Sequence, residues 1–239
     1  MRYSHEMVVD VFDTDLNGVA RASSFLKYLQ TAATAQLRSS HPNDDDLRAA
    51  GMAFILSTID IELLRPVKAW ERLTNESWGC FGKGFTFPRA YHMYDETGDV
   101  LWGLSTWALL NFEEKKIVRY SDEFYGFVPE VAPDIAIPRL RLPPRDEMGL
   151  VGHYQVRYAV TDINQHLNNT YYPDMFTSFL DMRGKWVKHL TIRFMKEAPL
   201  GSTLAIYVKK TEEDKYLFLS LLENGEINAE AAFTLSDLT

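Results

Sequence analysis

Apolar residues along the chain either alternate with polar ones or form short continuous runs, which is the pattern expected of buried and half-buried strands. In the first half, the strand-like segments cover residues 7–12, 53–62, 71–79, 85–94 and 100–111. In the second half they cover residues 154–160, 189–195, 203–209, 216–223 and 227–234. Residues 24–38 and 170–183 are instead helix-like. Each half is therefore predicted to contain a strand, a long helix and then a set of antiparallel strands.

The two halves also repeat short polar motifs in the same order. Residues 15–20, Asp-Leu-Asn-Gly-Val-Ala, align at a constant offset with residues 162–167, Asp-Ile-Asn-Gln-His-Leu. Further along, residues 95–100 parallel residues 222–227, in which Asn224-Gly225 is a strong hairpin signal. A sheet that buries one face needs a cover, and one helix is the large apolar cover in each half. The pattern predicts a duplicated α+β unit.

Proline marks the boundary between the halves. Half of the ten prolines fall between Pro129 and Pro144, and such a stretch cannot form a helix and contributes poorly to a sheet. We expect an extended linker at residues 128–146, which separates a domain at residues 1–127 from a domain at residues 147–239.

Composition and charge narrow the class of protein. The chain has 239 residues and a formal net charge of −8, which argues against nonspecific nucleic-acid binding. It has no apolar run long enough for a membrane span and no secretory signal in its first residues. Its single cysteine, Cys80, excludes an intrachain disulfide and fits a reducing compartment. These features predict a cytoplasmic protein with neither nucleic acid nor membrane as a partner.

Candidate chemistry is concentrated in the second copy of the repeated motif. Asp162, Asn164 and His166 occupy alternate positions, so in an extended segment their side chains would share one face. That face would offer an acceptor, a neutral donor and a group that titrates near neutrality. The alternative for Asp162 and Asn164 is a purely structural role in a turn or cap, and a lone histidine is also often structural. The first copy has Val19 at the position of His166, which indicates that the first half has no catalytic site of its own.

A helix is expected directly after this motif. Asn168 or Asn169 can cap it, Pro173 falls in its first turn, and Gly184 stands where a glycine would end it. Free N–H groups at the start of such a helix could stabilise an oxyanion.

Four segments together resemble the acyl-ACP thioesterase family of the bacterial type. They are residues 59–70, the strand at 102–111 with its Ser-x-Trp, the Asp-x-Asn-x-His-x-Asn-Asn pattern at 162–169, and the strand at 190–198. The resemblance spans nearly the whole chain in the right order. It implies two tandem hotdog domains, each an antiparallel sheet wrapped around one long central helix. It also implies hydrolysis of fatty acyl-acyl carrier protein to free fatty acid and holo-ACP.

The resemblance implies Asp162, Asn164, His166 and Glu197 as catalytic positions. Plant members have Glu-Cys where this chain has Glu197-Ala198, and alanine cannot attack a thioester. We therefore expect attack by water, with Glu197 and His166 as candidate bases and Asn164 as the donor to the thioester carbonyl. Asp162 is expected to orient the loop or His166. No cofactor is expected, since the chain lacks the metal, phosphate-loop and dinucleotide motifs.

The resemblance also suggests which residues contact the substrate. In this family the first domain houses the acyl chain, and the alternative for each apolar candidate is ordinary core packing. The candidate tunnel residues are Phe25, Leu29, Phe54 and Leu56. Docking of the acidic carrier protein needs local positive charge. Arg183, Lys185 and Lys188 supply it, with a solvated helix end as the alternative.

Three other functions remain open on the sequence. The first is the same hydrolysis on acyl-CoA, the second a hotdog hydratase or dehydratase, and the third a non-catalytic acyl-binding module, which Ala198 keeps possible. The tandem pair is expected to act as a monomeric pseudo-dimer or to form a homodimer.

Overall fold

Antiparallel strands dominate the computed structural model, which describes residues 2–238. The chain divides into two units by its internal contacts. Unit 1 comprises residues 2–9, 27–65 and 70–137, and unit 2 comprises residues 10–26, 66–69 and 138–238. The segment that carries the first copy of the repeated motif thus belongs to the same unit as the second copy.

Unit 1 contains an antiparallel sheet with the strand order β1-β3-β4-β5-β2 and a short strand, β6, beside β5. Its strands are β1 (Tyr3–Val8), β2 (Met52–Leu63), β3 (Arg72–Gly79), β4 (Phe87–Asp95), β5 (Gly98–Asn111) and β6 (Lys116–Val118). The four long strands from β2 to β5 agree with the sequence prediction within two residues at either end. A short helix, α2 (Asp44–Ala49), is capped by Asn43.

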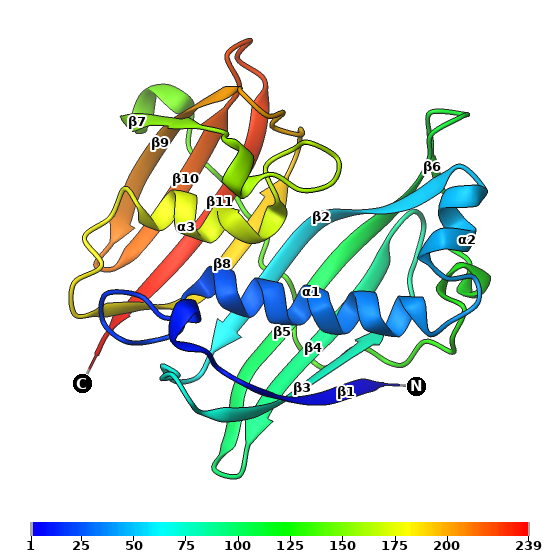
Figure 1. Ribbon diagram of the computed structural model, residues 1–239. Helices are drawn as coiled ribbons and strands as arrows, with labels where there is room; N and C mark the ends of the chain where they lie inside the picture. The colour runs from blue at the N-terminus through cyan, green and yellow to red at the C-terminus, as the bar shows by residue number, and fades with distance from the viewer. Residues whose placement is uncertain (1, 239) are drawn as a thin grey trace. The chain divides into compact units, whose positions relative to one another are not determined.

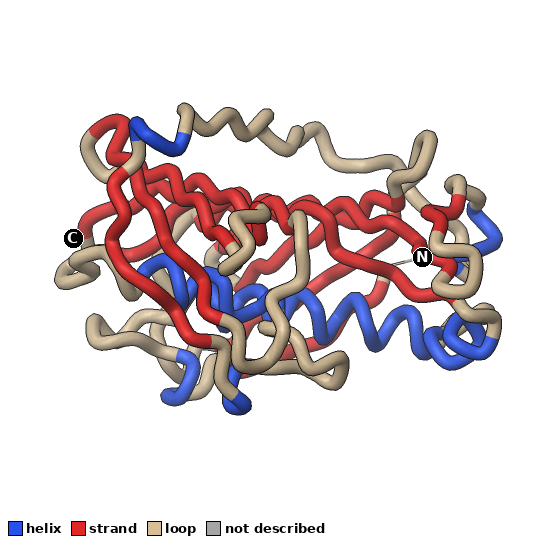
Figure 2. The backbone as a smooth tube through the Cα atoms, turned by 90° about the horizontal axis from the view of Figure 1, so that it is seen from above, coloured by secondary structure: helices blue, strands red, loops and turns tan. Residues whose placement is uncertain are grey.

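A long helix, α1 (Ala22–Arg38), lies across one side of the unit 1 strands (Figures 1 and 2). The Asn75 side chain on β3 donates to the Tyr28 carbonyl, and the buried Arg89 on β4 donates to Gln36 Oε1 at 2.7 Å. These bonds attach α1 to the sheet at Tyr28 and at Gln36, more than one helical turn apart. The helix predicted at residues 24–38 is confirmed.

The sheet strands of unit 2 are also antiparallel, with the order β8-β11-β10-β9-β7. Its strands are β7 (Gly149–Gln155), β8 (Lys185–Phe194), β9 (Thr203–Glu212), β10 (Lys215–Leu221) and β11 (Ile227–Asp237). A short helix, α3 (Tyr172–Thr177), packs on this sheet (Figure 1). Phe176 of α3 lies 4.8 Å from the Phe218 ring and 6.0 Å from the Phe233 ring, which forms the aromatic core of the unit.

The long helix predicted at residues 170–183 is wrong. Residues 169–171 form a 3-10 turn, and α3 ends at Thr177, with Gly184 in the left-handed conformation well beyond its end. The hydroxyls of Thr177 and Ser178 donate to the carbonyls of Pro173 and Asp174, at 2.8 and 2.6 Å. Such bonds satisfy the last carbonyls locally and favour an early stop. The helix that follows the motif is therefore short.

Two predicted strand segments are also displaced. Residues 7–12 and 154–160 were expected to be strands, but β1 and β7 lie earlier, and each is followed by a 3-10 turn, at Val11–Asp13 and Tyr158–Val160. The displacement is the same in both halves, which agrees with the sequence repeat. The predicted hairpin at Asn224-Gly225 is confirmed, with Gly225 at a φ of 84° between β10 and β11.

The proline-rich segment between the two halves is largely without regular secondary structure. Residues 131–144 contain no helix or strand. Near its end, Leu142 packs with Met148, Leu219 and Leu221, so this part of the segment covers apolar side chains of the unit 2 sheet.

Candidate active site

The candidate motif forms a closed turn rather than an extended segment. The N–H of Asp162 donates to the carbonyl of His166 at 2.9 Å, and Gln165, at a φ of 63°, donates back to the carbonyl of Asp162. Thr161 and Leu167 pair across the base of the turn. The motif was expected at a strand end or in a loop, and it forms a turn, so strand alternation does not set the directions of its three polar side chains.

Asp162 holds this turn together. Its Oδ1 accepts from the backbone N–H groups of Asn164 and His166, at 2.9 and 3.3 Å. Its Oδ2 lies 3.5 Å from the Asn164 carboxamide nitrogen, which is a weak contact. The carboxylate therefore fixes the backbone beneath His166, and the carboxamide of Asn164 stays exposed and weakly bound.

Glu197 reaches the turn from the end of β8. The N–H of Leu167 donates to the Ala198 carbonyl, and the N–H of Leu200 donates to the Gln165 carbonyl, both at 2.8 Å. These bonds place Glu197 Oε2 3.4 Å from His166 Nδ1. His166 is 27% exposed and Glu197 65% exposed, so solvent reaches both groups. Residues far apart in sequence thus form a carboxylate–imidazole pair.

The residue beside Glu197 points away from solvent. Ala198 is fully buried, and its carbonyl is used by Leu167. Cys80 gives no substitute nucleophile, because it is fully buried in unit 1 and burial raises the pKa of its thiol to about 11. The protonated thiol is the unreactive form at neutral pH.

Two further residues support the end of β8, and the sequence reading missed them. The Asn228 carbonyl accepts from the N–H groups of Met195 and Lys196, and its Nδ2 donates to the Lys196 carbonyl at 2.6 Å and to the Tyr172 hydroxyl at 2.9 Å. Its Oδ1 accepts from Ser220. Burial raises the pKa of Tyr172. The hydrogen bond from Asn228 lowers this pKa, and the Glu197 and Asp162 carboxylates raise it further. Asn228 is one of several polar residues of β11, so the sequence carried no signal that singled it out.

The helix start offers fewer free donors than expected. The N–H groups of Asn168, Thr170 and Tyr171 already donate to Val160, to the Asn168 side chain and to the Asn168 carbonyl. Of the two predicted cap residues, Asn168 caps the 3-10 turn at Asn169–Tyr171, whereas α3 itself has no side-chain cap. Side-chain donors near His166 are therefore better candidates for an oxyanion than these backbone groups.

The first copy of the motif has the same backbone geometry with different chemistry. Asp15 Oδ1 accepts from the N–H groups of Asn17 and Val19, at 2.8 and 3.3 Å. The Asn17 carboxamide, however, donates to the carbonyls of Met182 and Lys185 and accepts from the N–H of Gly184. Val19, which stands in place of His166, is buried. The first copy therefore binds the backbone of residues 182–185 and has a structural role.

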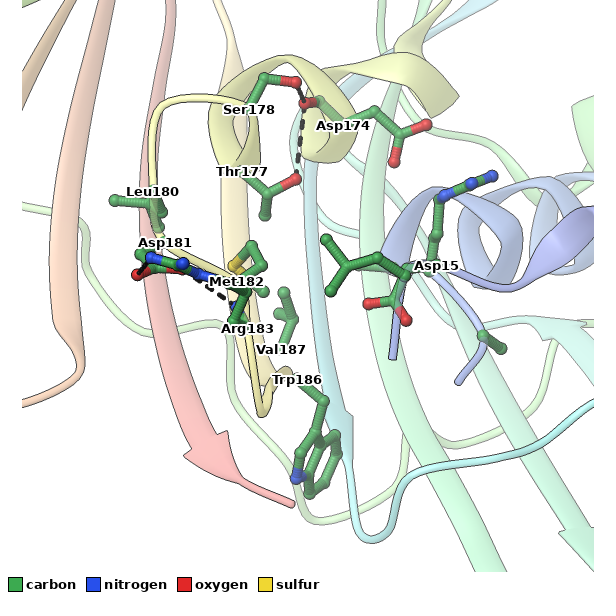
Figure 3. A pocket seen from close by; sticks show the side chains of 14 residues that line it. Asp15, Asp174, Thr177, Ser178, Leu180, Asp181, Met182, Arg183, Trp186 and Val187 are labelled. Carbon is green, nitrogen blue, oxygen red and sulfur yellow. Dashed lines mark hydrogen bonds and ion pairs between the residues drawn. The ribbon is translucent and has the colours of Figure 1, made fainter. Parts of the chain in front are cut away.

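A pocket of about 560 Å³ lies in front of the first copy. Side chains from the Asp15 loop line one side, and residues between Asp174 and Val187 line the other (Figure 3). The pocket contains none of the four candidate catalytic residues.

The four apolar residues predicted to contact the acyl chain are buried or partly buried. Phe25, Leu29 and Leu56 are buried, and the Phe54 ring lies 5.1 Å from the Phe87 ring in the core of unit 1. None of the four lines the pocket of Figure 3.

The residues predicted for carrier docking are largely neutralised. Lys185 Nζ lies 2.7 Å from Asp214 and 3.1 Å from Asp237, and Arg183 pairs with Asp181. Lys188 is exposed. These residues are at the start of β8, whereas Glu197 follows its end, and ten residues of strand span about 33 Å.

Within residues 2–238, no group of three or more His, Cys, Asp or Glu side chains is placed to hold a metal ion. None of the helices in this part of the chain is long and apolar enough to span a membrane.

Comparison with known proteins identifies the class. The family model of the acyl-ACP thioesterase N-terminal domain matches residues 1–127, and that of the C-terminal domain matches residues 145–236. No curated protein sequence matches the chain. An acyl-ACP thioesterase from Bacteroides thetaiotaomicron is similar in structure, with a TM-score of 0.89, 17% identity and 98% of each chain covered. The 12:0-ACP thioesterase from Umbellularia californica gives a TM-score of 0.86 at 14% identity, covering 99% of this chain and 97% of the other.

The fold and the family models together define a thioester hydrolase with a hotdog-like, antiparallel architecture. The chain belongs to the acyl-ACP thioesterase family.

Proposed function

We propose that this chain hydrolyses the thioester of fatty acyl-acyl carrier protein at the Asp162–His166 turn of unit 2. The family supplies the reaction, which releases fatty acid and holo-ACP. The observation that supports this site is the 3.4 Å approach of His166 and Glu197 beside a buried Ala198. A carboxylate–imidazole pair open to solvent, with no thiol beside it, suits attack by water.

The reaction then needs no covalent enzyme intermediate. Glu197 and His166 hold a water molecule, and one of them takes its proton as the water oxygen bonds to the thioester carbon. The Asn164 carboxamide donates to the carbonyl oxygen as it becomes an oxyanion. Collapse of this intermediate breaks the carbon–sulfur bond, and the proton passes to the leaving thiolate.

Asp162 acts in this scheme through the backbone. Because its Oδ1 already accepts from the N–H groups of Asn164 and His166, it is a positioning residue for both side chains. The weak 3.5 Å contact to the Asn164 carboxamide leaves that group available to the substrate.

The decisive experiment follows hydrolysis of an acyl-ACP chain-length series, with matched acyl-CoA in parallel, by measuring released thiol. Wild type should hydrolyse acyl-ACP, and His166→Ala and Glu197→Gln should each lower kcat about 10²- to 10⁴-fold. Near-wild-type rates in both variants would rule out this site. If acyl-CoA is hydrolysed faster than acyl-ACP, the proposed substrate is wrong but the proposed mechanism of hydrolysis still holds. A 3-hydroxyacyl thioester tests the hydratase alternative, and absence of thiol release would leave a binding module.

The proposal extends to the architecture. Residues 1–127 form an N-terminal hotdog domain that binds the acyl chain, residues 128–146 a linker, and residues 147–239 the catalytic hotdog domain. The repeated motif and the matched 3-10 turns of the two halves support this tandem arrangement. Phe25, Leu29, Phe54 and Leu56 are proposed to line the acyl tunnel. A cytoplasmic location and a monomeric or homodimeric state belong to the same proposal.

A further inference from the structure

The loop around His166 exposes large apolar side chains. Tyr158 is 86% exposed and Ile163 is 85% exposed, and Leu200 is also exposed. Single exposed apolar residues are common on protein surfaces. Here, however, all three belong to one hydrogen-bonded structure: Thr161 N–H donates to the Tyr158 carbonyl, and Leu200 N–H donates to Gln165. We call Tyr158, Ile163 and Leu200 the apolar rim.

Positive charge accompanies the rim. Arg157 directly precedes Tyr158, is exposed, and its guanidinium donates to Gln155 at 3.2 Å. Within the described part of the chain, no carboxylate lies within ion-pair distance of Arg157. By contrast, Arg183 and Lys185 are paired with acids and lie about one strand length, or about 33 Å, from Glu197.

We propose that the apolar rim and Arg157 form the surface that receives the carrier protein. This inference rests on the proposed function, which brings the thioester held by the carrier protein to His166. The carrier is acidic and the chain has a formal net charge of −8, so long-range charge opposes their association. Burial of Tyr158 and Ile163 supplies a contact that does not depend on charge, and Arg157 supplies a local attraction.

The sequence repeat provides matched controls. Leu16 occupies the position of Ile163 in the first copy and is 72% exposed, and Val11 occupies the position of Tyr158 at the start of the matching 3-10 turn. Both control side chains sit on the same backbone geometry, but beside Val19 instead of a histidine. A general effect of removing exposed apolar surface should be equal in the two sets.

The test compares Ile163→Ser and Tyr158→Ser with Leu16→Ser and Val11→Ser. Rim variants should raise KM for acyl-ACP about tenfold each, with kcat nearly unchanged, since loss of one buried apolar contact corresponds to about this factor. The control variants should leave that KM unchanged. A small acyl N-acetylcysteamine thioester should be hydrolysed equally by wild type and by all four variants.

Two results would overturn the assignment. An equal rise of KM in rim and control variants would remove the special role of the His166 loop. An equal loss on the small thioester would mean that the rim substitutions distort the turn instead of weakening docking. Direct titration of wild type and variants with holo-ACP measures the contact without hydrolysis. It therefore separates failure of this surface, seen as unchanged Kd in the rim variants, from failure of the proposed reaction.

Discussion

At the scale of single residues, Asn17 and Asn164 have the same type, the same turn and the same aspartate beneath them, yet different surroundings. The Asn17 carboxamide makes bonds of 2.7 and 2.9 Å to the carbonyls of Met182 and Lys185. The Asn164 carboxamide has a 3.5 Å contact to Asp162. The Asn17 amide is therefore fully used in hydrogen bonds to the backbone, and the Asn164 amide is available to a substrate.

Alanine substitution should separate these roles. Asn164→Ala should lower kcat about 10²- to 10³-fold, the cost of one oxyanion donor, and change stability by less than about 0.5 kcal/mol. Asn17→Ala should leave kcat unchanged and lower the free energy of unfolding by about 1–3 kcal/mol, because it leaves carbonyls without partners. Steady-state kinetics and denaturant unfolding check both. A similar loss of kcat in the two variants would contradict the assignment.

The single cysteine gives a second prediction at this scale. Since burial raises the pKa of Cys80 to about 11, its thiol should not react with a thiol reagent at pH 8 in the native protein and should react fully after unfolding. Cys80→Ala should keep kcat on acyl-ACP. Loss of activity in a folded Cys80→Ala protein would mean that Cys80 takes part in catalysis.

At the scale of elements, the end of β8 is held by a side chain from β11. Asn228 Nδ2 donates to the Lys196 carbonyl at 2.6 Å and to Tyr172 on α3, while Ser220 of β10 donates to Asn228 Oδ1. This group joins three elements directly before Glu197. We expect this group to position the Glu197 carboxylate against His166.

Asn228→Leu should therefore affect both stability and the chemical step. Buried partners left unsatisfied cost about 1–3 kcal/mol each, and displacement of Glu197 should lower kcat more than it changes KM. Ser220→Ala is the matched control, because it removes one bond to Asn228 but keeps the bond to Lys196. It should lower stability and keep kcat. If both variants lose stability but keep the wild-type kcat, Asn228 is a core residue without a positioning role.

The elements also show what the sequence could predict. The strands from β2 to β5, the hairpin at Gly225 and α1 follow local periodicity and turn chemistry, so their ranges were close. The second helix was predicted too long, because apolar spacing continued past Thr177 while the hydroxyls of Thr177 and Ser178 closed the helix locally.

The candidate site likewise contains some residues that the sequence could predict and others that it could not. Asp162, Asn164 and His166 lie in one short motif, so spacing and the family resemblance found them, although the predicted extended backbone was wrong. Asn228 meets Tyr172 because α3 packs on the sheet, and it meets Lys196 because sheet register brings β11 beside β8. No local pattern encodes that register, so these two could not be found from the sequence.

At the scale of the whole molecule, acidic residues outnumber lysine and arginine by 33 to 25. Many of the cations near β8 are consequently paired, including Arg193 with Glu230 and Lys196 with Glu226. In this protein, the presence of a basic residue in the sequence is therefore weak evidence that the residue belongs to a docking surface. Its pairing in the structure decides whether its charge is available to a partner.

Lys185 provides the test of this argument. Hydrogen bonds to Asp214, and then to Asp237, raise the pKa of Lys185 above its ordinary value of 10.5. A raised pKa means that the stabilisation is complete below about pH 10.5 and is lost as pH rises through the folded-state value. Lys185→Gln should thus lower Tm equally at pH 7 and pH 9 and leave KM for acyl-ACP unchanged. Arg157→Gln, the unpaired cation beside the apolar rim, should raise that KM and keep Tm. The reverse pattern, with KM sensitive to Lys185 and insensitive to Arg157, would place the carrier protein at the start of β8.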